Sequence, residues 1–157
     1  MFLRFAIVLA VAVFAIAATQ PNSAIAQSAS DNWLGKTHHV AIHVDDKDPK
    51  RMNMALNNAA NVTKYYESKG ERVTIEIVAY GPGLHMLRAD TSPVKDRIAA
   101  MSLELGNVSF AACGNTMRKM AKKSGKPVKL LDEAKQVSSG VVRLIELQEK
   151  GYAYVRP

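Results

Sequence analysis

Residues 108–117 read Val-Ser-Phe-Ala-Ala-Cys-Gly-Asn-Thr-Met, an apolar run that leads without a linker into a basic stretch. The turn signal Gly106-Asn107 precedes the run, whose length and composition are typical of a short buried strand. The residues that follow Gly114 favour a helix. Cys113 therefore lies at a predicted strand-to-helix corner, the kind of connection from which parallel α/β folds are built.

Strands and helices alternate before this corner. β-Branched residues predict strands over residues 37–44 and 73–80, each followed by turn residues. Apolar residues at three- and four-residue spacing predict helices over residues 49–70 and 94–105. This alternation of strand and helix favours a parallel sheet with helices on both of its faces.

The pattern continues after the corner. Residues 128–137 are ambiguous between a helical turn and a short strand, and residues 152–155 read as a last strand before the terminal Pro157. Between them, residues 140–151 favour a helix, and its apolar positions are expected to face inward: Val141, Leu144, Ile145 and Leu147. The predicted fold class is α/β, a three-layer α/β/α sandwich with a mainly parallel sheet.

The N-terminus has the pattern of a secretory signal. An apolar run over residues 5–18 follows the single charge of Arg4, and the small-residue triplet Ala24-Ile25-Ala26 suits a signal peptidase. The run is shorter than the ~20 residues of a bilayer-spanning helix, so an uncleaved anchor is the less favoured reading. We therefore expect a signal peptide over residues 1–26, a flexible leader over 27–36 and the folded domain over 37–157. A periplasmic or secreted location follows, with no stable membrane insertion after cleavage.

Charge and cysteine content restrict the partners. The chain has a net charge of +7, and an exported basic domain is expected to meet small anions, acidic proteins or membrane headgroups rather than nucleic acid. Cys113 is the single cysteine, which excludes an intramolecular disulfide and a cysteine metal cluster. The histidines of residues 38–43 alternate between the faces of a strand and do not form one metal site. With no glycine-rich nucleotide motif either, we expect no cofactor and no metal.

The carboxyl ends of parallel strands are where such sheets bind ligands, and this rule selects the candidate residues. Cys113 is the candidate nucleophile, because a helix N-terminus favours a thiolate. His85, on the loop after the second predicted strand, is the candidate proton-transfer partner. The start of the basic helix supplies the expected anion-binding residues: Gly114, Asn115, Thr116, Arg118 and Lys119. The alternative is a buried, inert Cys113, a solvated His85 and a solvated lysine-rich helix face.

Several separated segments resemble the DsrE/DsrF-like family, in particular an uncharacterised exported branch of it. They are the strand-cysteine-helix segment over residues 106–117, the helix segment 56–61, the Gly-Pro-Gly-Leu of residues 81–84, and the C-terminal stretch from Ser139 to Pro157. The resemblance extends over residues 37–157. It implies a DsrE-like parallel α/β sheet, assembly into trimers or hexamers, and a cysteine that carries sulfur as a persulfide between relay proteins. Cys113 is the residue that matches this cysteine.

Two functions follow from these observations. In the first, the chain is a periplasmic DsrE-like sulfur-handling protein, a sulfurtransferase or sulfur carrier that holds sulfane sulfur on Cys113. Its partners would be an anionic sulfur compound or a sulfur-relay protein. In the second, the chain is a non-catalytic oligomeric domain that binds a small ligand or acts as a scaffold, and Cys113 is merely buried.

Overall fold

The computed structural model describes residues 35–157, so the predicted signal peptide and most of the predicted leader lie outside the described residues. A five-stranded sheet forms the middle layer in the order β4-β3-β2-β1-β5, and all four neighbouring pairs are parallel. This confirms the predicted fold class. The strands are β1 (Thr37–Val44), β2 (Arg72–Ala79), β3 (Val108–Cys113), β4 (Ala134–Val137) and β5 (Ala153–Val155).

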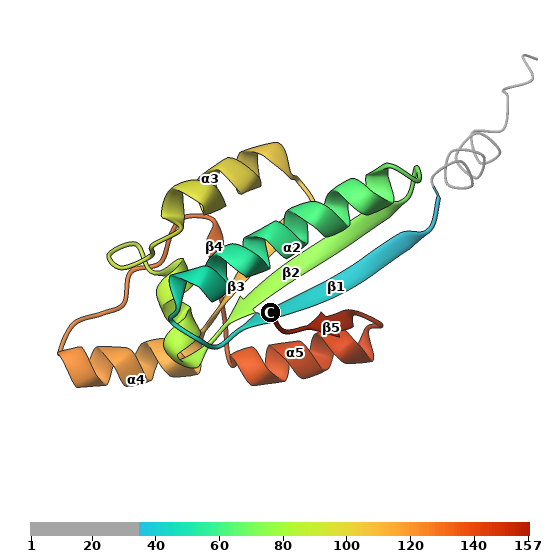
Figure 1. Cartoon of the computed structure of the whole chain (residues 1–157). Helices are drawn as coiled ribbons and strands as arrows, with labels where there is room; N and C mark the ends of the chain where they lie inside the picture. The colour runs from blue at the N-terminus through green and yellow to red at the C-terminus, as the bar shows by residue number, and fades with distance from the viewer. Residues whose placement is uncertain (1–34) are drawn as a thin grey trace, which may run out of the picture. The chain divides into compact units, whose positions relative to one another are not determined.

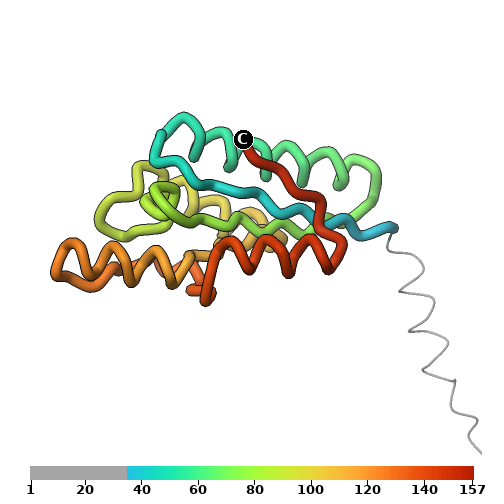
Figure 2. The backbone as a smooth tube through the Cα atoms, turned by 90° about the horizontal axis from the view of Figure 1, so that it is seen from below, coloured from blue at the N-terminus to red at the C-terminus, as the bar shows by residue number. Residues whose placement is uncertain are grey.

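Helices cover both faces of the sheet. In Figure 1, α2 and α3 lie on one side and α4 and α5 on the other, and Figure 2 shows the strands running between α2 and α5. The chain begins α2 with the N-cap Asp48, whose side chain accepts a hydrogen bond from the backbone N–H of Lys50, and with a proline in the first turn. The helices are α2 (Pro49–Glu67), α3 (Lys95–Glu104), α4 (Gly114–Ser124) and α5 (Gly140–Glu149), with a 3₁₀ helix η1 (Gly81–Leu87) after β2.

The alternation of side chains along the strands divides the core in two. Ile42, Ile77 and Phe110 point toward α2 and α3, where they join the larger apolar cluster. Ala41, Val78 and other small residues point the opposite way, into a smaller cluster beneath α5. The carboxyl-terminal halves of β1, β2 and β3 are buried on both faces, and most of their residues there are apolar.

The rotation of α5 differs from the prediction. Leu144 and Leu147 are buried as expected, but Val141 and Ile145 are 51% and 50% exposed. Gly140 is the cause, because it lies on the inward stripe with Leu144 and Leu147 and turns Val141 and Ile145 away from the sheet. The outer face of α5 therefore carries apolar side chains.

One buried ion pair fixes α5 to the sheet. The guanidinium of Arg143 donates to both carboxylate oxygens of Glu76 on β2, at 2.6 and 2.7 Å, and Glu76 is 9% exposed. Such a bidentate pair sets the position of the helix along the strands. Within residues 35–157, none of the helices has the length and apolar character needed to cross a membrane.

Candidate functional site

The candidate site is built around Cys113, at the carboxyl end of β3. This residue is the last of the strand and also the N-cap of α4, so its sulfur lies at the positive end of that helix. The backbone N–H groups of Asn115 and Thr116 favour its thiolate form, although the Asn115 N–H donates its hydrogen bond to the carbonyl oxygen of Ser138 at 3.2 Å. The side chain is 4% exposed, so these donors act on a sulfur that is largely shielded from water.

A second helix N-terminus reaches the same sulfur. Gly140 is the first residue of α5, and its backbone N–H also favours the thiolate form of Cys113 and lowers the pKa of the thiol. The approach requires glycine: a Cβ at position 140 would lie 2.9 Å from Cβ and Cδ1 of Tyr80 and 3.2 Å from Cβ of Cys113. The positive ends of α4 and α5 therefore converge on one sulfur atom.

Thr116 completes the set of donors. Its Oγ1 accepts a hydrogen bond from the backbone N–H of Gly81 at 2.9 Å. That contact uses an acceptor position of the hydroxyl and leaves its O–H hydrogen available, and the Thr116 side chain favours the thiolate form of Cys113. Gly81 has a positive φ of 53°, a conformation that favours glycine, so the start of η1 is shaped to make this contact.

These donors decide the ionisation of Cys113. Burial is the largest single influence and raises the pKa of the thiol, because it disfavours the charged form. The Thr116 hydroxyl and the backbone N–H groups of Gly140, Thr116 and Asn115 favour the thiolate and together outweigh burial, so the pKa of Cys113 lies below its ordinary value. A lowered pKa is the property that a nucleophilic or sulfur-carrying cysteine needs.

A basic groove opens beside this corner, with a volume of about 560 Å³. Thr116 and Tyr80 are shared between the groove and the surroundings of Cys113. We call it the lysine groove, because three lysine side chains line it and none of the described residues that line it is acidic. Its lining residues are Lys47, Tyr80, Gly81, Pro82, His85, Thr116, Lys119, Met120 and Lys123.

The structure brings some of the predicted residues together and leaves others outside. His85, Thr116 and Lys119 all line the lysine groove. Gly114 is buried under the carbonyl oxygens of residues 137 and 138, and the backbone N–H of Asn115 donates to the carbonyl oxygen of Ser138 at 3.2 Å. Arg118 is outside the groove, because its guanidinium donates to the Asn115 side chain on another face of α4.

His85 is held as a neutral base. Burial is the main cause that lowers the pKa of its imidazole, and the positive charges of Arg88 and Lys47 lower it further. Its Nδ1 forms a 2.8 Å hydrogen bond with Oγ1 of Thr91, which fixes the ring at the wall of the groove. At neutral pH this imidazole can therefore accept a proton from a group bound there.

The sequence did not single out Lys47, Tyr80, Met120 or the approach of Gly140 to Cys113. A signal for three of them was present, because Lys47 and Tyr80 follow the ends of β1 and β2, and residue 140 follows β4. Lys123 lies one helical turn beyond Lys119, so the spacing along α4 placed it on the same face.

A buried histidine network lies next to Tyr80. The His43 ring stacks on that of Tyr80, with 4.6 Å between the centroids, and its Nδ1 is 2.7 Å from the hydroxyl of Tyr154. Its Nε2 has no hydrogen-bond partner among the described residues, and the Asp45 carboxylate is 3.9 Å away. Burial, the main cause, lowers the pKa of His43, and Arg156, which pairs with Asp45, lowers it as well. His43 therefore supports Tyr80 as an uncharged ring.

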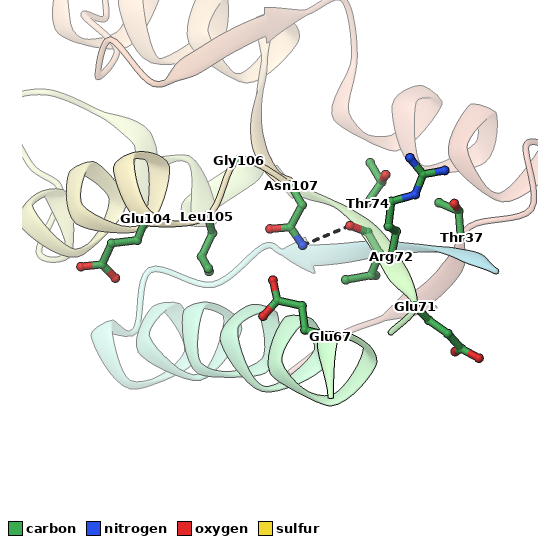
Figure 3. Close-up of a pocket in the computed structure, with 10 residues that line it drawn as sticks. Thr37, Glu67, Glu71, Arg72, Thr74, Glu104, Leu105, Gly106 and Asn107 are labelled. Carbon is green, nitrogen blue, oxygen red and sulfur yellow. Dashed lines mark hydrogen bonds between the residues drawn. The ribbon is translucent and has the colours of Figure 1, made fainter. Parts of the chain in front are cut away.

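A different hollow lies at the opposite, amino-terminal edge of the sheet (Figure 3). It has a volume of about 480 Å³, and its charged lining is three acidic side chains, those of Glu67, Glu71 and Glu104, against one basic side chain, that of Arg72. Asn107 crosses its floor, where its side-chain amide donates to the carbonyl oxygen of Val73 at 3.0 Å. This hollow repels anions and contains no thiol, so the lysine groove is the better candidate for the functional site.

Comparisons with other proteins agree with this fold. The DsrE/DsrF-like family matches residues 38–157, which include Cys113 and every residue of the lysine groove. No curated protein matches the chain. The solved structure of MTH1491, a protein of unknown function from Methanobacterium thermoautotrophicum, is similar at 34% identity, with a TM-score of 0.65 over 76% of this chain and 99% of that one. The chain therefore belongs to the DsrE/DsrF-like family, a membership that points to a protein of the sulfur-relay type.

Proposed function

We propose that the protein carries sulfane sulfur as a persulfide on Cys113, outside the cytoplasm. The observation that supports this most directly is the convergence of two helix N-termini and the Thr116 hydroxyl on one sulfur atom. The same donors that stabilise a thiolate also stabilise a persulfide anion, which places its negative charge one atom further out. The lysine groove beside the sulfur supplies positive potential for an anionic donor.

Transfer of a sulfane sulfur to Cys113 requires no added oxidant. The Cys113 thiolate attacks the sulfane sulfur of the donor, a new S–S bond forms, and the bond that held this sulfur in the donor breaks. The electron pair of the broken bond leaves with the donor, as a thiolate from an organic persulfide or as sulfite from thiosulfate. Unloading is the same reaction with an acceptor thiolate as the nucleophile.

Neighbouring residues support this step in two ways. Lys119 and the other groove lysines attract the donor and stabilise the departing anion. His85 is neutral at pH 7, so it accepts the proton of the newly formed Cys113 persulfide, or that of an incoming acceptor thiol. These roles use the same face of the molecule, at the carboxyl edge of the sheet.

A second function is favoured by one observation, the 4% exposure of Cys113. In this alternative the lysine groove binds a small anionic ligand, no sulfur is transferred, and the thiol is a packing residue. Labelling of the native protein with iodoacetamide distinguishes the two, because a packing thiol reacts only after denaturation.

The decisive experiment is intact-protein mass spectrometry after incubation with polysulfide or thiosulfate. A carrier gains the mass of one sulfur atom, and a Cys113→Ser variant, which keeps the size of the side chain, gains none. An unmodified wild-type protein with every donor would reject the proposal. N-terminal sequencing of exported protein, which should begin at Gln27, tests the location.

A further inference from the structure

The size of the lysine groove is informative about the donor. Its volume of about 560 Å³ falls in the range of sites for small organic molecules, ~300–1,000 Å³. An inorganic sulfur anion is only as large as a few water molecules, each of which occupies ~30 Å³, and would leave most of the groove empty. The groove therefore suits an organic molecule better than thiosulfate.

The charged and apolar side chains of the groove indicate the chemical character of the molecule that would bind there. Pro82 and Met120, together with the Tyr80 ring, form an apolar wall, while Lys47, Lys119 and Lys123 supply positive charge. Lys47 comes from the loop after β1 and the other two lysines from α4, so the charges belong to two separate elements of the chain. A ligand that meets all three has more than one anionic group and a partly apolar body between them.

From these observations we infer that the sulfur donor or acceptor of Cys113 is a peptide-sized organic thiol that carries carboxylates. This inference rests on the proposed function and specifies its substrate class. The carboxylates pair with the groove lysines, and the carbon chain lies along Met120 and Pro82. The thiol end then lies toward Thr116, the residue that contacts both the groove and the Cys113 sulfur.

The transfer is the one described above, with an organic persulfide R–S–SH as the donor. Its outer sulfur bonds to Cys113, the inner S–S bond breaks, and R–S⁻ leaves with the electron pair. The proton of the persulfide passes to His85, whose lowered pKa keeps the imidazole able to accept it. The product thiolate keeps the same carboxylates, so it leaves by the same groove.

The test uses glutathione persulfide as the organic donor and thiosulfate as the inorganic one, with the full domain and mass spectrometry of Cys113 loading. The variant is Lys119→Gln with Lys123→Gln. The control is Lys122→Gln with Lys126→Gln, which removes the same charge from exposed positions that do not line the groove. We expect the groove variant to raise the KM for glutathione persulfide about tenfold, as expected for two lost exposed ion pairs. The control should change it by less than about twofold at physiological ionic strength.

A second measurement is independent of sulfur transfer. S-methylglutathione has the carboxylates but no transferable sulfur, so it should slow iodoacetamide labelling of Cys113 in the wild type and lose this effect in the groove variant. Sodium sulfate at equal ionic strength should not slow it. Absence of protection, or a KM for thiosulfate as low as that for glutathione persulfide, overturns the inference and leaves the proposed function standing. Protection without loading by either donor overturns the proposed function instead.

Discussion

Replacing Gly140 by alanine tests the convergence of the two helices on Cys113. The new Cβ would lie 2.9 Å from Cβ and Cδ1 of Tyr80 and 3.2 Å from Cβ of Cys113, and the first of these contacts is closer than real Cβ atoms tolerate. The Tyr80 ring is stacked on His43 and cannot turn aside freely. The start of α5 must therefore move away from the sheet.

This movement has two measurable effects. Overpacking of a close contact costs ~1–3 kcal/mol, which for a domain of this size lowers Tm by about 5–10 °C. The N–H of residue 140 also moves away from the sulfur, and a helix N-terminus stabilises a nearby anion by ~0.3–1 kcal/mol, or up to ~2 kcal/mol where the site is partly buried. Since one pKa unit corresponds to ~1.4 kcal/mol, the pKa of Cys113 should rise by up to about one and a half units.

Thermal unfolding measures the first effect, and the rate of iodoacetamide labelling between pH 5 and 10 measures the second. Gly106→Ala is the matched control, because a Cβ there meets nothing within 4 Å and its φ is not positive. We expect the control to change stability by less than about 1 kcal/mol. Equal Tm values for the two variants, together with an unchanged labelling midpoint at position 140, would refute the reasoning.

Two further predictions concern the two histidines with lowered pKa values and the exposed face of α5. The folded-state pKa values of His43 and His85 lie below the unfolded value of ~6.5, so the unfolded chain binds more protons between these values and stability decreases as the pH falls below ~6.5. Tm should therefore be lower at pH 5 than at pH 7.5, and an increase would contradict this. The apolar outer face of α5 is proposed to mediate the homo-oligomer, so Ile145→Glu should reduce the mass measured by light scattering, while Leu103→Glu, at an exposed position on α3, should not. A wild-type mass equal to one chain would reject the assembly.

Most of the fold was predictable because β1 and β2 are rich in β-branched residues and end at turn residues, and β3 is a short apolar run. β4 was not, since it is an edge strand whose residues Ala-Lys-Gln-Val are only partly covered and show no periodicity. The rotation of α5 could not be predicted either. It depends on the packing of Gly140 against Tyr80, a contact between segments that are distant in the sequence.

The residues of the candidate site were also only partly predictable from the sequence. Parallel sheets bind ligands at the carboxyl ends of their strands, and this rule was enough to predict that Cys113, Thr116 and His85 lie at one edge of the sheet. Arg118 was selected by charge alone, although it lies on a different side of α4 from Lys119. The pairing of His43 with Tyr154 required the position of β5 beside β1, which a sequence without periodicity in its last residues does not reveal.

The attachment of α5 and β5 has a consequence for motion within the folded state. β5 pairs with β1 over only three residues, and Leu144, Leu147 and the Arg143–Glu76 pair provide much of the remaining hold on α5. Such a unit opens locally at a lower free energy than global unfolding, so its amides should exchange with deuterium before those of β2. Each opening would withdraw the Gly140 N–H and uncover the sulfur of Cys113 together. The rate at which large reagents label this thiol would then depend on how often α5 and β5 open. It would not depend on the exposed fraction of Cys113 in the closed structure.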